Sequence, residues 1–183
     1  MAPSKSLAGT TTRSWLNTMK ETGMDVDTIF SLVHTQLFDA GMKAVGELKE
    51  RFGEDQPNVK KWPSQTTAIG VIVNRKTLYH RDRGGNPSMY DILVAAGTYR
   101  SSLMELPDID ATLQYNPGTV IAICGKVLRH GVKNWEGGER ICYAFYCRDN
   151  IHHRLNLPRT DWPHLEWYQK YFSRGYLSRQ QIA

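Results

Sequence analysis

Cysteine is scarce in this sequence, with three residues in 183, and long apolar runs are missing altogether. Three thiols, at Cys124, Cys142 and Cys147, are too few and odd in number for a disulfide framework, which predicts a reducing, intracellular setting. No apolar run approaches the ~18–20 residues of a membrane helix, so we expect no membrane partner. The first residues lack the apolar core of a signal peptide, so secretion is not expected.

Acidic residues are outnumbered, with 18 aspartates and glutamates against 23 lysines and arginines, for a net charge of +5. This balance favours an anionic partner without proving one, because many basic proteins bind none. Hydrophobic residues make up 40% and charged residues 22% of the chain, which excludes disordered and collagen-like classes. The length fits one domain with a sizeable core.

The N-terminal third predicts a helix preceded by an arm. Residues 1–23 are polar with little apolar periodicity and predict a loose arm. Residues 25–52 place apolar side chains at helical spacing, and Asp25 or Asp27 is a suitable N-cap. Residues 54–65 predict a polar linker.

From residue 66 onward the pattern changes to short apolar segments separated by glycine, proline and asparagine turns. The predicted strands are 68–73, 92–99, 103–106, 111–115, 119–124, 127–132 and 141–147. Short strands at roughly 8 to 12 residue spacing are typical of a sandwich or barrel. The aromatic-rich segment 161–175 predicts a C-terminal helix that packs on the barrel. The expected fold class is mainly β with flanking helices, α+β.

Segment 79–82 contains the first candidate residues for chemistry. In an extended segment, residues i and i+2 point to the same side, so His80 and Asp82 present an imidazole and a carboxylate to one point. Two histidines and one carboxylate on one face of a metal form the site of non-haem Fe(II) oxygenases. The competing pair His164 and Glu166 lies in the predicted C-terminal helix, where i and i+2 do not face each other.

A third ligand is expected from a later strand. His130 lies in the predicted strand 127–132, beyond Asp82 in the chain. Segment 134–138 predicts a hairpin turn, after which Arg140 opens the next strand and lies beside the strand of His130 in an antiparallel return. Its guanidinium can hold a carboxylate through two parallel hydrogen bonds, as the distal end of 2-oxoglutarate requires.

Alternation along the last predicted strand supports a barrel with a ligand-lined interior. One face mixes charge, small residues and an aromatic: Arg140, Cys142, Ala144, Tyr146 and Arg148. The other face is more apolar and is expected to pack against helices: Ile141, Tyr143, Phe145 and Cys147.

Several segments between residues 74 and 155 carry a family resemblance, in order along the chain. They are 74–82 (NRKTLYHRD), 90–94 (YDILV), 106–108 (LPD), 116–120 (NPGTV), 130–132 (HGV) and 137–142 (GGERIC). On these segments the chain resembles the TET/JBP family of Fe(II)- and 2-oxoglutarate-dependent DNA-base dioxygenases, and most closely its compact fungal members. The resemblance implies a double-stranded β-helix, or jelly-roll, core.

The resemblance also implies a site and an activity. His80, Asp82 and His130 would bind Fe(II), Arg140 would pair with the distal carboxylate of 2-oxoglutarate, and Arg75 would assist near its other end. With O2, the enzyme would oxidise the methyl group of 5-methylcytosine in DNA to hydroxymethyl and further oxidised products. The partner would be double-stranded DNA with the methylated base flipped out, because a base in the duplex cannot reach the iron.

The substrate pocket is less determined. Tyr146 and Arg148 match positions that line the base pocket, but some relatives carry His at the second position, and Gly85 stands where some place an acid. These departures leave open N6-methyladenine in DNA or a methylated RNA base as the substrate. Trp135, at the predicted hairpin tip, either stacks on a base or caps the core. A metal-dead nucleic-acid-binding barrel is the alternative from a different class.

We divide the chain into an arm with a buttressing helix (1–65), a catalytic core (66–155) and a C-terminal helical tail (156–183), all forming one domain. We expect a monomer, and a nuclear location follows from the DNA substrate alone. Structural zinc is disfavoured because Cys142, Cys147, His152 and His153 lack a standard paired spacing.

Overall fold

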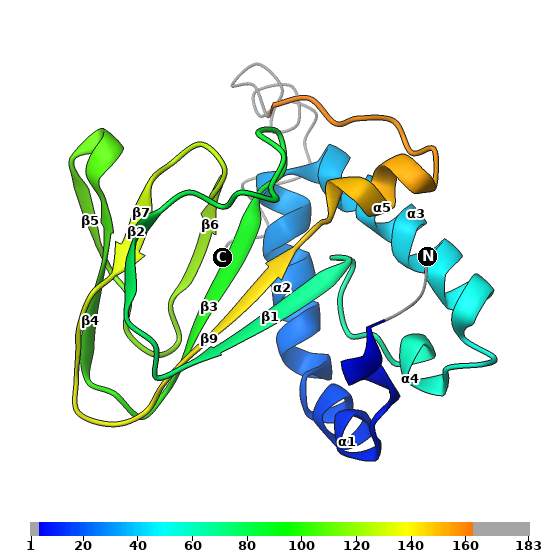
Figure 1. Cartoon of the computed structure of the whole chain (residues 1–183), viewed down its shortest axis with the longest axis horizontal. Coiled ribbons are helices and arrows are strands. Elements are labelled where there is room, and N and C mark those ends of the chain that lie inside the picture. The colour runs from blue at the N-terminus through cyan, green and yellow to red at the C-terminus, as the bar shows by residue number, and fades with distance from the viewer. Residues whose placement is uncertain (1–3, 163–183) are drawn as a thin grey trace, which may run out of the picture.

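The computed structural model describes residues 4–162, which form a helical layer against two facing β-sheets (Figure 1). The helices are η1 (Lys5–Ala8), α1 (Thr10–Thr18), α2 (Lys20–Val33), α3 (Thr35–Phe52), α4 (Pro57–Lys60), η2 (Pro107–Ile109) and α5 (Asp149–Arg154). The strands are β1 (Ala68–Val73), β2 (Thr77–His80), β3 (Asp91–Gly97), β4 (Ser101–Leu106), β5 (Ala111–Gln114), β6 (Val120–Ile123), β7 (His130–Val132), β8 (Trp135–Glu136) and β9 (Arg140–Tyr146).

The strands form two antiparallel sheets. The first has the order β1-β9-β3-β6, and the second has the order β2-β7-β4-β5 with β8 paired to β4. Apart from the hairpin of β4 and β5, neighbouring strands are distant in sequence, because the chain crosses repeatedly from one sheet to the other. This arrangement is a double-stranded β-helix, so the predicted fold class is confirmed.

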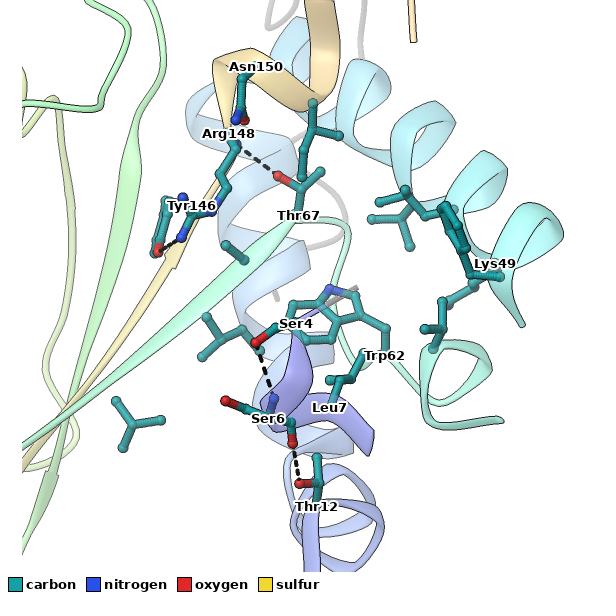
Figure 2. Close-up of a pocket in the computed structure, with 18 of the residues that line it drawn as sticks. Ser4, Ser6, Leu7, Thr12, Lys49, Trp62, Thr67, Tyr146, Arg148 and Asn150 are labelled. Carbon is teal, nitrogen blue, oxygen red and sulfur yellow. Dashed lines mark hydrogen bonds between the residues drawn. The ribbon is translucent and has the colours of Figure 1, made fainter. Parts of the chain in front are cut away.

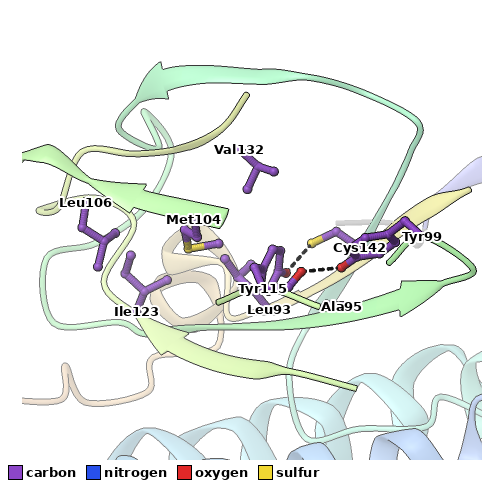
Figure 3. Close-up of a cluster of buried hydrophobic side chains, with 9 residues drawn as sticks. All are labelled: Leu93, Ala95, Tyr99, Met104, Leu106, Tyr115, Ile123, Val132 and Cys142. Carbon is purple, nitrogen blue, oxygen red and sulfur yellow. Dashed lines mark hydrogen bonds between the residues drawn. The ribbon is translucent and has the colours of Figure 1, made fainter. Parts of the chain in front are cut away.

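The barrel core lies between the two sheets (Figure 3). Leu93 and Cys142 come from the first sheet, Met104 and Val132 from the second, and Tyr115 follows β5. Tyr115 is fully buried and extends among these side chains. On β3 and β4 the core residues are two apart, Leu93 and Ala95 on β3 and Met104 and Leu106 on β4, as the packing of facing sheets requires.

A second core joins the first sheet to the helical layer. Phe30 of α2 and Leu37 of α3 pack against Ile92 of β3 and Phe145 of β9, and all four are fully buried. The predicted division of β9 into two faces is thus confirmed, since Cys142 lies in the barrel core and Phe145 in the helix-facing core.

The prediction of a loose arm and one helix over residues 25–52 is wrong. Residues 10–18 already form α1, whose Leu16 is 1% exposed, and the long helix is divided between α2 and α3 at His34. His34 adopts φ −156°, and its Nδ1 accepts a hydrogen bond from the Leu37 amide at the start of α3. The apolar periodicity continues through the break, and neither Gly nor Pro marks it, so the sequence pattern gives no sign of it.

The predicted capping role of Asp25 or Asp27 is also wrong, since α2 begins at Lys20. Asp27 instead accepts hydrogen bonds from the Ser64 hydroxyl and the Gln65 amide, both at 2.8 Å. It therefore holds the end of the predicted linker against α2. Burial raises the pKa of the Asp27 carboxyl.

The predicted strands are confirmed, with shifted ends, but the predicted hairpin is wrong. β7 pairs with β2 and β4, whereas β9 pairs with β1 and β3 in the other sheet. Segment 134–138 contains β8, which pairs with β4, and the chain then crosses to the first sheet. A hairpin assumes that consecutive strands are neighbours, and the double-stranded β-helix breaks that tendency.

The predicted C-terminal helix lies almost wholly outside the described residues, as does the pair His164 and Glu166. Asp161 and Trp162, the described part of that prediction, belong to no helix. Within residues 4–162, no helix has the length and apolar character needed to cross a bilayer.

Candidate metal centre

The three residues proposed as metal ligands converge at one end of the barrel. His80 of β2 and His130 of β7 are direct cross-strand partners, and their ring centroids are 4.4 Å apart. Asp82 follows β2 by two residues. Its Oδ1 lies 3.4 Å from His80 Nε2, and its Oδ2 lies 3.9 Å from His130 Nε2. One ligand atom from each residue lies within 4.8 Å of the others, and no other such His/Cys/Asp/Glu group occurs among residues 4–162.

Both histidine rings are held in the form that binds a metal. His80 Nδ1 lies 3.0 Å from the Leu78 carbonyl, and His130 Nδ1 lies 3.0 Å from the Leu128 carbonyl. A carbonyl only accepts hydrogen bonds, so each Nδ1 donates its proton. In the neutral ring, Nε2 is then the nitrogen with a lone pair for a metal, and each Nε2 faces an Asp82 carboxylate oxygen, at 3.4 Å from His80 and 3.9 Å from His130. Donation of the second ring N–H to a backbone carbonyl is typical of metal-ligating histidines.

Asp82 is held by residues that the sequence analysis did not single out. Its amide donates to the Gly125 carbonyl at 2.9 Å. A Cβ on Gly125 would lie 2.2 Å from Asp82 Oδ2 and 2.7 Å from Asp91 Oδ2, so only glycine leaves room for both carboxylates. Burial, and then the charge of Asp82, raise the pKa of Asp91 to about 7. Asp91 lies within a segment that carries the resemblance, which was the available signal for it.

Arg140 lies at the start of β9, inside the barrel, and is 3% exposed. Its Nη1 donates to the Arg75 carbonyl at 3.2 Å, and its amide donates to Asn74 Oδ1 at 2.8 Å. Its Nε is buried without a hydrogen-bond partner, and no carboxylate among residues 4–162 forms an ion pair with it. A buried cation with an unsatisfied N–H donor destabilises the folded protein unless an anion binds to it.

The aromatic wall beside Arg140 was missed by the sequence analysis. The Arg140 guanidinium lies 5.5 Å from the centre of the Tyr115 ring, and the Tyr115 hydroxyl lies 3.2 Å from Cys142 Sγ. The Tyr99 hydroxyl donates to the Tyr115 carbonyl at 2.5 Å. Burial raises the pKa values of Tyr99, Tyr115 and Cys142, so all three are neutral near pH 7. The buried guanidinium therefore carries the positive charge of this wall.

The side chains at this site fit both Fe(II) and 2-oxoglutarate, the two groups that the resemblance implies. Two imidazole nitrogens and one carboxylate, with the side opposite the protein open, suit Fe(II). The unpartnered Nε of Arg140 suits one carboxylate of a small dianion. Arg75 contributes its carbonyl to Arg140, whereas its own side chain is exposed. The predicted side-chain role of Arg75 stays a prediction.

Comparison with known proteins connects this geometry to a family. The TET/JBP family, described as the oxygenase domain of the 2OGFeDO superfamily, matches residues 4–149. The chain belongs to the TET/JBP family. It is thus an oxygenase domain of the superfamily that uses Fe(II), 2-oxoglutarate and O2. Among curated proteins, none matches the chain.

One solved structure agrees with the fold of the barrel, and two others share less of it. NgTET1 in complex with 5mC DNA is 13% identical, with a TM-score of 0.57, over 84% of this chain and 56% of that chain. The chain therefore spans little more than half of NgTET1. A Cupin 2 conserved barrel domain protein from Salinispora arenicola is 17% identical, with a TM-score of 0.36, over 48% and 68% of the two chains. An RmlC-like cupin from Desulfovibrio desulfuricans is 12% identical, with a TM-score of 0.32, over 42% and 71%.

The predicted base-pocket residues, Tyr146 and Arg148, lie at and just beyond the end of β9, at the end of the strand away from Arg140. Ile92 pairs with Phe145, so Asp91 lies beside Tyr146, and Asp91 contacts Asp82. The Arg148 guanidinium donates to the Tyr146 hydroxyl at 3.1 Å and lies 5.4 Å from the ring centre (Figure 2).

Tyr146 and Arg148 also line a cavity of about 650 Å³ between β1 and the helices. Phe52 contributes to its apolar wall. Figure 2 shows Trp62, which also lies in that wall, and Lys49, one of its polar residues. None of the three candidate iron ligands lines this cavity. This cavity and the metal centre are therefore separate.

Two further predicted site residues are placed by the structure. Gly85 donates its amide to the Asp82 carbonyl at 3.4 Å, and a Cβ there would lie 3.3 Å from Lys126 Cβ. It is thus beside the metal centre, with little room for a larger residue. Trp135 lies in β8, packs against the barrel core and donates its indole N–H to the Gly138 carbonyl at 3.3 Å. This placement agrees with the core-capping alternative for Trp135.

The zinc alternative finds no support in the described residues. Cys142 lies in the barrel core and Cys147 in the helix-facing core, on opposite sides of the first sheet. His152 is 4% exposed, and both of its ring nitrogens lack a hydrogen-bond partner within the described part of the chain. Two thiols separated by a sheet cannot share one tetrahedral metal site.

Proposed function

We propose that this chain is a dioxygenase that oxidises the methyl group of 5-methylcytosine in double-stranded DNA. The observation that carries the proposal is the occurrence, in one barrel, of a histidine, aspartate and histidine centre and a buried arginine whose Nε has no hydrogen-bond partner among residues 4–162. Membership of the TET/JBP family supports the same class of chemistry. The DNA substrate is supported by the likeness to NgTET1, which was solved with 5mC DNA.

The residues have distinct parts in the proposed reaction. His80, Asp82 and His130 would hold Fe(II), and Arg140 would hold the distal carboxylate of 2-oxoglutarate. When these groups and O2 are bound, they supply an oxidation in which one oxygen atom enters succinate, CO2 is released and the other oxygen atom enters a methyl C–H bond.

The exposure of the metal end suits a large substrate. The side chains of His80 and Asp82 are 38% and 44% exposed, so a flipped base can reach them from solvent. Tyr146 would stack on that base, and Arg148 would meet its edge. Basic side chains close to the centre, on Arg83 and Lys126, would add salt-dependent affinity for the DNA backbone. We propose a nuclear location on the same ground, and a monomer as the active form.

The experiment uses duplex DNA with one 5-methylcytosine and a matched duplex with one N6-methyladenine. Each is incubated with protein, Fe(II), 2-oxoglutarate and ascorbate, after which nucleosides and succinate are measured by mass spectrometry. His80→Ala and Arg140→Ala are the test variants. His153→Ala, on an exposed histidine of α5, and Arg100→Ala, on an exposed arginine, are the matched controls.

Hydroxymethylcytosine that is made by wild type and both controls, and lost in both test variants, supports the proposal. Oxidation of N6-methyladenine alone would overturn the substrate and keep the enzyme class. Succinate with no altered base would overturn DNA as the substrate. Absence of both succinate and bound iron would overturn the enzyme and leave a nucleic-acid-binding barrel.

A further inference from the structure

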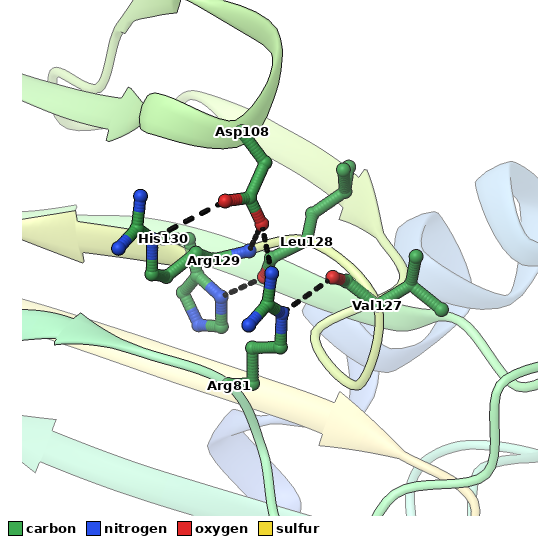
Figure 4. Close-up of polar contacts among 6 residues, drawn as sticks. All are labelled: Arg81, Asp108, Val127, Leu128, Arg129 and His130. Carbon is green, nitrogen blue, oxygen red and sulfur yellow. Dashed lines mark hydrogen bonds and ion pairs between the residues drawn. The ribbon is translucent and has the colours of Figure 1, made fainter.

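A carboxylate outside the metal centre connects the two chain segments that carry its ligands (Figure 4). Asp108 lies in η2, the turn between β4 and β5. Its Oδ2 accepts from Arg81 Nη2 at 2.7 Å and from the Arg129 backbone amide at 2.8 Å. Its Oδ1 lies 3.2 Å from Arg129 Nε. One side chain therefore makes three charge-assisted contacts to two segments that are distant in sequence.

Each of these contacts lies one residue from a candidate ligand. Arg81 stands between His80 and Asp82, and Arg129 immediately precedes His130. Arg81 also donates from Nε to the Val127 carbonyl at 2.8 Å, so it joins the same two segments a second time.

The contact with the Arg129 amide leads directly to a histidine ring. The Leu128 carbonyl and the Arg129 N–H belong to one peptide unit. That unit donates to Asp108 Oδ2 and accepts from His130 Nδ1 at 3.0 Å. Hydrogen bonds in such a chain polarise one another, so the carboxylate strengthens the acceptor of the His130 proton. The result is a carboxylate acting on a ligating histidine through one peptide group.

The β-sheet alone holds this region weakly. β7 has three residues, and its register with β2 shifts between the pairs Thr77–Val132 and His80–His130. Its pairing with β4 is limited to Glu105–Gly131. A short, irregular ladder leaves the relative position of the two histidines poorly determined, so an additional connection has a structural consequence.

We propose that Asp108 is a positioning residue of the metal centre, which sets the separation of the two ligand segments and keeps His130 Nε2 free for metal. The inference rests on the proposed function only in taking the triad to be the metal site. Isolated surface ion pairs contribute little. The effect of Asp108 is expected from its backbone contact and from the convergence of its three bonds.

The experiment measures the affinity of the metal-free protein for Co(II), from the visible absorption of the bound ion. Asp108→Ala should weaken Co(II) binding by about 10-fold or more, as loss of outer partners of metal ligands does. Arg129→Gln removes the side-chain contact but keeps the backbone N–H, so its effect should be clearly smaller. Asp108→Glu should restore part of the affinity, and Asp110→Asn is the matched control on the same turn.

A second measurement does not involve a metal. The ring nitrogens of His130 in the metal-free protein, followed by nitrogen-15 NMR, should report protonation at Nδ1 in wild type and a mixture of tautomers in Asp108→Ala. Thermal unfolding identifies any variant that fails to fold. If Asp108→Ala does, Asp108→Asn, which keeps the shape but loses the charge, takes its place in both measurements.

Equal Co(II) affinity in wild type and the Asp108 variants would overturn the inference, as would equal losses in Arg129→Gln and Asp108→Ala. A wild-type protein that binds no Co(II) would overturn the inference together with the metal site. A wild-type protein that binds Co(II) but oxidises no base would refute the proposed substrate alone. The Co(II) comparison would then still decide the role of Asp108.

Discussion

The two ends of the barrel interior differ in exposure and in how far their polar groups are satisfied. At the metal end, His80 and Asp82 are more than one-third exposed, and the histidine rings have backbone partners. At the other end, Arg140 is 3% exposed and its Nε has no hydrogen-bond partner among residues 4–162. An open end admits a large substrate, whereas a closed end selects a small anion by enclosing it. The difference teaches that one barrel can provide an enclosed site for a small anion at one end and an exposed site for a large substrate at the other.

Removal of a metal ligand should weaken metal binding at the open end and leave the closed end unchanged. His130→Ala is expected to weaken Co(II) binding by more than about 100-fold, beyond the range for loss of an outer partner. The cause is loss of a nitrogen donor whose direction is set by the Leu128 carbonyl. Co(II) titration against His153→Ala measures it. Undiminished binding in His130→Ala would remove His130 from the ligand set.

Removal of the buried Arg140 guanidinium should weaken anion binding at the closed end and leave the metal end unchanged. Arg140→Ala is expected to weaken 2-oxoglutarate binding by about 30-fold or more, because truncating one partner of a buried charge pair costs 2–5 kcal/mol. Co(II) affinity should remain close to that of wild type. Calorimetric titration of the Co(II)-loaded protein, with Arg100→Ala as the control, makes the comparison. Loss of both affinities together would show that the two ends are not separable.

A methyl group added at the open end should lower metal affinity by displacing the Asp82 carboxylate. Gly125→Ala puts a Cβ within 2.2 Å of Asp82 Oδ2, so the carboxylate must move. We expect metal affinity to fall about 10-fold. Gly46→Ala is the matched control, since its Cβ would meet no heavy atom within 4 Å and should stabilise α3 by about 0.5–1 kcal/mol. Metal affinity unchanged in Gly125→Ala would show that Asp82 tolerates displacement.

The smallest expected effect lies in the helical layer, away from both ends. Burial lowers the pKa of His34, so the unfolded chain binds this proton more readily than the folded one. The contribution of His34 to stability is therefore present above about pH 6.5 and decreases as the pH falls below it. His34→Asn keeps a capping side chain without this titration and should flatten that part of the pH profile of chemical unfolding.

The control for that profile is His152→Gln, because burial also lowers the pKa of His152 and adds a slope of the same sign. If the pH dependence of unfolding is the same in His34→Asn and wild type, the loss of stability at low pH comes from other groups. Metal affinity at constant pH should not change in either variant, since neither residue touches the triad.

Local pattern predicted a large part of this molecule. The strand over residues 68–73 matches β1, and the alternation along β9 separates the barrel interior from the helix-facing side. Both follow from the period of two in an extended chain, which any short segment expresses by itself. The helix break at His34 was missed, because an imidazole that caps α3 is recognisable only once Ser88 and Leu37 are in place.

The sequence by itself determined which residues share a strand face and which pair, His80 and Asp82, is spaced to meet a metal. The tertiary structure alone decided which sheet β9 joins, that Arg140 is enclosed with no anionic partner from residues 4–162, and that Asp108 bonds both ligand segments. The physical reason is one of range. Side-chain periodicity is a property of neighbouring residues, whereas strand partners, burial and convergent hydrogen bonds depend on contacts between segments that only the packed core brings together.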